Sequence, residues 1–269
     1  MFFKTKDLMT VGNISLGLAG VLVAMEGMGV STREEAGTYV FWSGLLIIMA
    51  VVFDMFDGVV ARALGQMNQF GAEFDNVADL TSYSIAPAFL LYLAYQKYAI
   101  LPGVEFDTTL RTIIAVTVAM FPAVFGCIRF ARFNVRKLDV PGFWIGFPRP
   151  MAALFYVSLV NSHLYLGSGV MGWIGVVLIV YASFMNLSLM PFIGHHDRKW
   201  SWHLGIILTF VWLTTLVAFV AGVIFKVMPE RTVFDVVLLW LSYDLFIQWT
   251  DIPKAAREEV ARLTADWNE

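Results

Sequence analysis

Four aspartates lie inside or beside two of the most apolar stretches of the sequence: Asp54, Asp57, Asp75 and Asp79. A carboxylate in a hydrocarbon environment is costly unless a partner neutralises its charge. One nearby arginine, Arg62, cannot balance four carboxylates. Bound divalent metal ions are the economical partner, so the sequence predicts a metal site in this region.

The spacing of these residues places the carboxylates on two helix faces. Two sets of residues recur at helical intervals: Asp54, Asp57, Gly58 and Ala61 in the first, and Gly71, Asp75 and Asp79 in the second. The intervening residues allow a tight turn, so two antiparallel helices would direct both carboxylate pairs at one polar cleft. Oxygen ligands without nearby Cys or His favour Mg²⁺ or Mn²⁺ over zinc, and Ca²⁺ is also compatible.

The same stretch resembles the signature of the CDP-alcohol phosphotransferase family, D-x2-D-G-x2-A-R-x8-G-x3-D-x3-D. It is filled without a gap by Asp54, Asp57, Gly58, Ala61, Arg62, Gly71, Asp75 and Asp79. The resemblance implies two metal ions held by the four aspartates, with Asp79 also acting as the general base. It further implies that the CDP moiety binds at Gly58, Ala61, Arg62 and Gly71, with Asn13 as an additional candidate. Close helix packing explains Asn13 equally well.

Composition predicts that this chain is an all-α integral membrane protein. Hydrophobic residues make up 59% of it and charged residues 14%, whereas soluble domains carry about 25% charged residues. We expect residues 1–250 to form one membrane domain of about eight transmembrane helices, and 251–269 to form a polar cytoplasmic helix. The expected spans are 9–28, 39–64, 73–95, 110–134, 149–167, 170–192, 202–226 and 232–250.

The distribution of basic residues predicts the orientation. With an even number of spans both termini share one side, and only five of the 18 Lys and Arg residues fall on the other side: Arg33, Lys97, Arg111, Lys226 and Arg231. The positive-inside rule therefore places both termini and the aspartate cleft on the cytoplasmic side. That side suits a nucleotide-bearing substrate.

Arg129 and Arg132 lie one helical turn apart near the inner end of the span 110–134. The positive-inside rule alone could explain them. Their depth favours a second explanation, in which their planar guanidinium groups bind the carboxylate or phosphate of a substrate. Asp244 and the loop of His195, His196 and Asp197 receive no role.

A second stretch, residues 126–153, narrows the resemblance. Its RFARFN sequence and following G-x-P-x-P segment are similar to the phosphatidylserine synthase branch. That similarity implies transfer of the phosphatidyl group from CDP-diacylglycerol to L-serine with release of CMP, in a membrane-embedded homodimer without a nucleic-acid partner. Asn76 and Tyr83 depart from the branch and leave choline, giving phosphatidylcholine, as an alternative acceptor. A cation transporter is an alternative from another class, since acidic residues in spans also mark ion paths.

Overall fold

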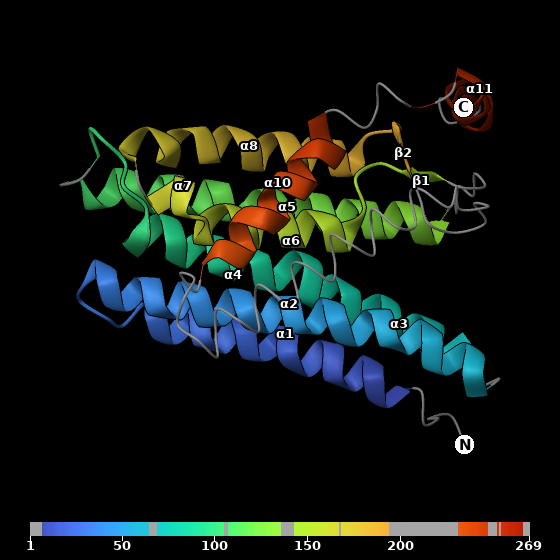
Figure 1. Ribbon diagram of the computed structural model, residues 1–269, viewed down its shortest axis with the longest axis horizontal. Coiled ribbons are helices and arrows are strands. Elements are labelled where there is room, and N and C mark those ends of the chain that lie inside the picture. Colours follow the sequence, from blue (N-terminus) through green and yellow to red (C-terminus); the bar gives the residue numbers. More distant parts are fainter. Residues whose placement is uncertain are drawn as a thin grey trace.

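Apolar helices, most of them aligned along one axis, dominate the described part of the chain (Figure 1). The structure is a computed structural model that describes residues 7–64, 69–104, 107–135, 143–166, 168–193, 231–246, 252 and 254–265, without the side chains of 57–64, 166, 193 and 255. The predicted span 202–226 and the loop containing His195, His196 and Asp197 lie outside these residues.

Five of the described helices are long and apolar enough to cross a membrane. They are α1 (Asp7–Gly27), the part Arg33–Phe56 of α2 (Arg33–Leu64), the continuous helix Gln69–Tyr98, α5 (Thr108–Val135) and α8 (Gly169–Leu187). The continuous helix comprises α3 (Gln69–Leu80), the π-helical turn η1 (Thr81–Ile85), α4 (Ala86–Leu93) and a second π-helical turn, η2 (Ala94–Tyr98). The expectation of a mainly helical membrane protein is confirmed, while the number of spans stays a prediction.

The helix starts follow local sequence signals. The Thr32 hydroxyl accepts a hydrogen bond from the Glu35 N–H at the start of α2, and the Asp107 carboxylate accepts one from Leu110 at the start of α5. The Ser168 hydroxyl does the same for Val170 at the start of α8. Such side chains satisfy N–H groups that the first helical turn leaves without a partner.

The predicted span 149–167 is divided in the structure. Helix α6 (Arg149–Asn161) ends after 13 residues, and a short helix α7 (His163–Leu166) follows. Ser162 separates them in an extended conformation, and its hydroxyl donates to the Leu159 carbonyl while accepting from the Tyr165 N–H. Helix α6 is about 20 Å long, which is too short to span a bilayer alone. It lies in the core, where Phe155 and Leu159 are fully buried.

A two-stranded antiparallel sheet, which the sequence did not lead us to expect, joins the ends of two helices. Strand β1 (Phe143–Ile145) pairs antiparallel with β2 (Pro191–Ile193), and Trp144 lies opposite Phe192. The strands follow α5 and α8 along the chain, so pairing them brings those two helix ends together. Helix α10 (Thr232–Phe246) runs obliquely across the bundle beside α6, and α11 (Lys254–Thr264), seen end-on in Figure 1, lies beyond β2.

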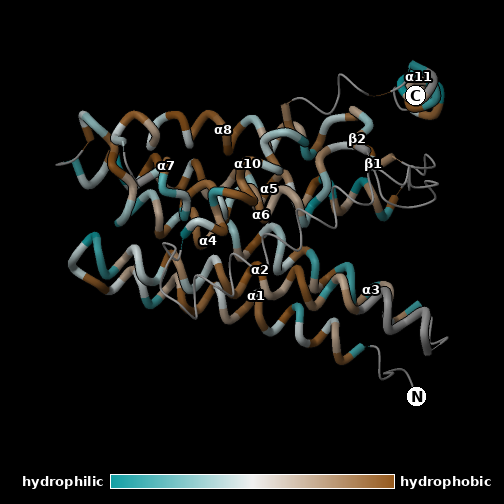
Figure 2. The backbone as a smooth tube through the Cα atoms, viewed as in Figure 1, coloured by the Kyte–Doolittle hydropathy of each residue, from teal (hydrophilic) through white to brown (hydrophobic). Residues whose placement is uncertain are grey.

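Hydrophobic residues recur along all the long helices (Figure 2), and many of their large side chains are exposed. Leu22, Ile113, Val177 and Leu239 are each more than half exposed. Large apolar side chains on so many outward faces are unfavourable in water and favourable in lipid. This surface is that of an integral membrane protein.

Candidate active site

Helices α2 and α3 bring three of the four predicted aspartates together. One carboxylate oxygen from each of Asp54, Asp75 and Asp79 lies within 4.8 Å of the others. Asp79 is buried and the other two are partly buried. Asp75 and Asp79 are one turn apart on regular α-helix, as their spacing predicts. The group offers only oxygen donors at a separation that one cation could bridge, so it could hold a divalent metal ion.

The remaining residues of the signature stay predictions. The side chains of Asp57, Ala61 and Arg62 and the surroundings of Gly58 lie outside the described residues. Gly71 is buried on α3, two turns before Asp79.

Asn13 joins the carboxylates from a third helix, α1. Its side-chain nitrogen Nδ2 donates to Asp79 Oδ1 at 3.3 Å and lies 3.5 Å from Asp54 Oδ1. Its Oδ1 atom is buried and has no hydrogen-bond partner within the described part of the chain. This oxygen is therefore open to a ligand or ion beside the aspartates. The structure thus places Asn13 at the predicted site, although its proposed contact with the CDP moiety stays a prediction.

A glycine allows α1 to approach the aspartate helix closely. The Ser82 hydroxyl in η1 donates to the Asn13 carbonyl at 3.1 Å. One turn further along α1, a Cβ added to Gly17 would lie 2.9 Å from Ser82 Cα. No larger residue fits at this crossing without displacing α1, so Gly17 contributes to the position of Asn13.

Arg149 is the contact that the sequence reasoning missed. It is the first residue of α6, and its Nη2 atom donates to Asp79 Oδ2 at 3.1 Å. Both side chains are mostly buried, at 14% and 13% exposure. With Asn13 on Oδ1 and Arg149 on Oδ2, both oxygens of Asp79 are held. The distribution of basic residues assigns Arg149 only to the cytoplasmic side. Its position between two prolines in an apolar segment is a signal that it has a more specific role.

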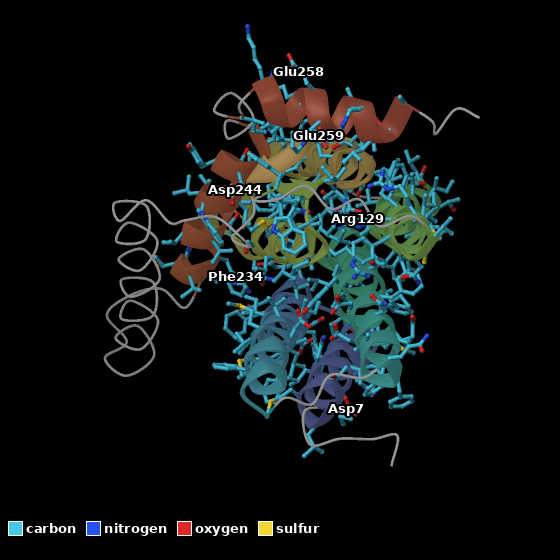
Figure 3. The ribbon with its side chains drawn as sticks, turned by 90° about the vertical axis from the view of Figure 1, so that its right-hand side faces the viewer. Asp7, Arg129, Phe234, Asp244, Glu258 and Glu259 are labelled. Carbon is cyan, nitrogen blue, oxygen red and sulfur yellow. The ribbon has the colours of Figure 1, made fainter. Side chains whose placement is uncertain are left out.

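Arg129 and Arg132 lie at the same end of the bundle and bind backbone carbonyls. Arg129 is buried and donates to the carbonyls of Asn186 and Gly146, and Arg132 donates to the carbonyl of Leu187 at 2.6 Å. These bonds tie α5 to the end of α8 and to Gly146, which follows β1. Figure 3 looks onto this end, with Arg129 between Asp7 on α1 and Glu258 on α11. The role of both arginines as substrate ligands stays a prediction.

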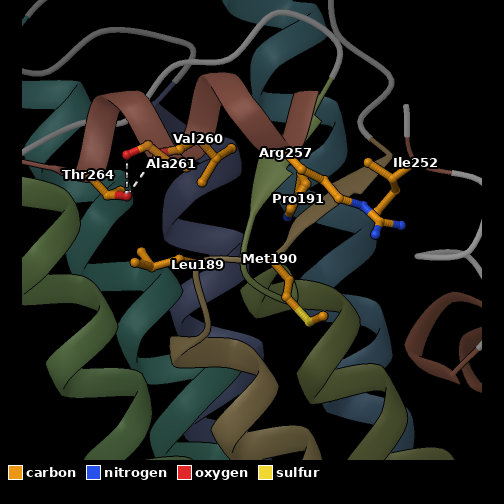
Figure 4. A pocket seen from close by; sticks show the side chains of 8 residues that line it. All are labelled: Leu189, Met190, Pro191, Ile252, Arg257, Val260, Ala261 and Thr264. Atoms are coloured by element: carbon orange, nitrogen blue, oxygen red, sulfur yellow. Dashed lines mark hydrogen bonds between the residues drawn. The ribbon is translucent and has the colours of Figure 1, made fainter. Parts of the chain in front are cut away.

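A separate cavity of about 380 Å³ lies under the C-terminal helix (Figure 4). It is lined by residues of α11, by Ile252 and by residues 189–191, and most of its surface is apolar. These residues do not include the carboxylate cluster, so the cavity and the candidate active site are distinct.

Fold and site together define a class: an integral membrane protein of apolar helices in which carboxylates from two helices are placed to hold a divalent cation. A family model described as CDP-alcohol phosphatidyltransferase matches residues 4–247, and the chain belongs to that family. The family resemblance inferred from the aspartate signature is thereby confirmed.

Relatives with curated names extend this result. A CDP-diacylglycerol--serine O-phosphatidyltransferase of Methanocaldococcus jannaschii is 38% identical over 122 residues, which are 44% of this chain and 52% of that protein. One of Helicobacter pylori is 27% identical over 184 residues, 67% of this chain and 73% of that protein. An archaetidylserine synthase of Methanothermobacter thermautotrophicus is 30% identical over 166 residues, 61% of this chain and 60% of that protein. The match thus spans about half the length of the first of these relatives.

Proposed function

We propose that this protein transfers the phosphatidyl group of CDP-diacylglycerol to the hydroxyl of L-serine and releases CMP. The observation that carries the proposal is the meeting of Asp54, Asp75 and Asp79, with Asn13 and Arg149 holding both oxygens of Asp79. The curated names of the relatives support serine as the acceptor. Family membership supports a CDP-linked donor.

The residues fit a divalent metal cofactor. The cluster is built from oxygen donors, which Mg²⁺ and Mn²⁺ prefer, and the buried Asn13 Oδ1 adds a neutral oxygen. We propose Mg²⁺ or Mn²⁺, two ions in all, with Asp57 completing the ligand set. Bound ions would screen the negative charge of the diphosphate that otherwise repels a nucleophile.

The chain's own residues supply the proton transfer. In this proposal the serine hydroxyl lies on Asp79, which accepts its proton as the oxygen attacks the phosphorus atom of the phosphatidyl group. A new P–O bond forms to serine, the P–O bond to CMP breaks, and CMP leaves with the electron pair. Asn13 and Arg149 fix the direction of the Asp79 carboxylate, so the base is oriented before the substrate arrives.

The Asp79→Asn variant tests this function. Purified full-length protein in detergent or nanodiscs is incubated with CDP-diacylglycerol, Mg²⁺ or Mn²⁺ and one of several labelled alcohols. We expect serine to be incorporated, and Asp79→Asn to lower turnover about 10²- to 10⁴-fold, as loss of a general base does. Incorporation of choline in place of serine would reject the acceptor, and unchanged turnover of Asp79→Asn would reject the base. Donor binding without CMP release from any alcohol would reject an enzyme altogether.

We also propose the cytoplasmic orientation, with both termini inside and eight spans, one of which is formed by α6 and α7 together. The contacts of the outer-side cations support it: Arg33 and Arg231 both lie over the Tyr98 ring, and Arg111 donates to the Ala99 carbonyl. They therefore gather at one end of the helices, whereas the aspartates occupy the other. The predicted homodimer stays a prediction.

Single-cysteine labelling tests the orientation. Cys127 is the only cysteine, so a Cys127→Ser background accepts new cysteines at Ser31, between α1 and α2, and at Glu258 on α11, both exposed positions. We expect an impermeant maleimide to label Ser31→Cys in intact cells and Glu258→Cys only after permeabilisation. The reverse pattern would overturn the orientation.

A further inference from the structure

Arg149 has one guanidinium nitrogen engaged and one open. Nη2 donates to Asp79, whereas Nη1 is buried without a hydrogen-bond partner among the described residues. A buried N–H group of a charged side chain is costly to leave unsatisfied. Such an atom beside the proposed base indicates a place for an acceptor oxygen that arrives with the substrate.

The backbone and a neighbouring ring hold this guanidinium in place. Pro148 precedes α6 and Pro150 occupies its first turn, which restricts the backbone on both sides of Arg149. The guanidinium carbon lies 5.9 Å from the centroid of the Phe130 ring, a distance that permits a cation–π contact. The side chain is therefore positioned before any ligand binds.

The two other arginines at this end are engaged differently. Both Nη atoms of Arg129 donate to backbone carbonyls, and Arg132 donates to the carbonyl of Leu187. Those bonds connect α5 to the end of α8 and to the residue after β1. Neither arginine has a hydrogen bond to Asp79 among the contacts of the described residues. Arg149 alone of the three is joined to the proposed base.

We propose that Arg149 binds the carboxylate of the acceptor substrate and so selects an amino-acid alcohol over a neutral or cationic one. This inference rests on the proposed function. In serine only two carbon atoms, Cβ and Cα, separate the hydroxyl oxygen from the carboxylate carbon, so a serine with its hydroxyl on Asp79 has its carboxylate within a few ångströms. A guanidinium already bonded to Asp79 can reach both groups, and its planar fork suits a carboxylate. Choline has no anionic group that Nη1 could bind.

Steady-state kinetics of Arg149→Gln and Arg149→Lys test the proposal on the full-length protein. L-serine is compared with serinol, in which a hydroxymethyl group replaces the carboxylate. We expect each variant to raise the KM for serine about tenfold or more, the loss typical of a charged hydrogen bond, with the KM for CDP-diacylglycerol nearly unchanged. The preference for serine over serinol should shrink by a similar factor, since serinol never used the contact. Arg262→Gln on α11, where the side chain is exposed, is the matched control and should behave as the wild type.

Three results would overturn the proposal while leaving the proposed function standing. The first is a higher KM for the donor with an unchanged KM for serine, which would assign Arg149 to a donor phosphate. The second is an increased KM for serine in Arg132→Gln but not in Arg149→Gln. The third is wild-type kinetics in both Arg149 variants. If the wild type itself used choline and not serine, the proposed acceptor would fail, and the carboxylate contact with it.

Thermal unfolding with added ligand tests substrate binding in variants that fold but do not catalyse the reaction. L-serine added with Mg²⁺ and CDP should raise the thermal unfolding midpoint of the wild type, and serinol should raise it less. Arg149→Lys, which retains the positive charge next to Asp79, should lose the difference between the two ligands. An equal difference in Arg149→Lys and the wild type would contradict the proposal.

Discussion

Asn13 and Asp79 are 66 residues apart in sequence, yet the amide of Asn13 donates to Asp79 Oδ1 at 3.3 Å in a buried contact. The bond joins α1 to α3, and the same amide lies 3.5 Å from Asp54. A neutral donor between two carboxylates lowers their mutual repulsion without adding a charge that would compete with a cation. Asn13 is thus suited to hold the cluster together both with and without a bound ion.

Replacing Asn13 with alanine should lower activity. Loss of a hydrogen bond to a charged group costs about 1.5–3 kcal/mol, so we expect kcat/KM for CMP release to fall about ten- to hundredfold. Ser15→Ala, on the exposed face of the same helix, is the control and should keep wild-type kinetics. Equal activity of the two variants would show that the Asn13 amide contributes nothing to the reaction.

Metal binding should depend on the clustered carboxylates. We expect Mg²⁺ or Mn²⁺ to raise the thermal unfolding midpoint of the wild type, since an ion at one hundred times its Kd stabilises by about 2.7 kcal/mol. Chelation should abolish CMP release. Asp75→Asn should lose most of the thermal shift, whereas Glu73→Gln, an exposed carboxylate on the same helix, should retain it. A full shift in Asp75→Asn would place the ion elsewhere.

Gly146→Ala should destabilise the protein more than Gly103→Ala does. Both glycines have positive φ, 72° and 87°, which costs an L-residue about 1–2 kcal/mol. At Gly103 an added Cβ would meet no atom within 4 Å, whereas at Gly146 it would lie 2.7 Å from the carbonyl oxygens of Asn186 and Ser188. Thermal unfolding should therefore show a larger loss for Gly146→Ala. Similar losses would mean that the backbone around Gly146 shifts at little cost to accommodate the extra carbon.

Arg231→Met should reduce stability without changing substrate affinity. Arg231 donates to the Asn161 side chain at 3.1 Å and to the Gly37 carbonyl at 3.0 Å, at the end of the bundle away from the aspartates. Losing these bonds should cost roughly 2 kcal/mol and lower the unfolding midpoint. The KM values for donor and serine should match those of Lys254→Met, an exposed control on α11. A large KM change in Arg231→Met alone would indicate coupling between the two ends.

Local periodicity predicted the long helices and the aspartate cluster because both depend on residues close together in sequence. The convergence of Asp54, Asp75 and Asp79 needed only two helices that are neighbours in the sequence. Contacts made by the fold as a whole could not be predicted in this way. Arg149 lies 70 residues from Asp79, and its two flanking prolines mark the position as unusual without indicating which residue it contacts.

The division of the predicted span 149–167 was also beyond local sequence signals. Neither glycine nor proline marks the break, which depends on one hydroxyl, that of Ser162, bonding to the backbone on both sides. The sheet of β1 and β2 was not predicted because each strand is only three residues long. Strand β2 follows β1 only after three helices, α6, α7 and α8, so the pairing of the two strands is a property of the assembled bundle.

Helix α6 has a consequence for how the protein reaches its membrane. With 13 residues, and with Phe155 and Leu159 fully enclosed by neighbouring helices, it cannot leave the insertion machinery as an independent hydrophobic segment. Its insertion therefore depends on the helices that surround it. Arg149 at its first residue would then reach Asp79 only in the last stage of biogenesis, so a chain truncated before that stage would carry the aspartates without a finished catalytic centre.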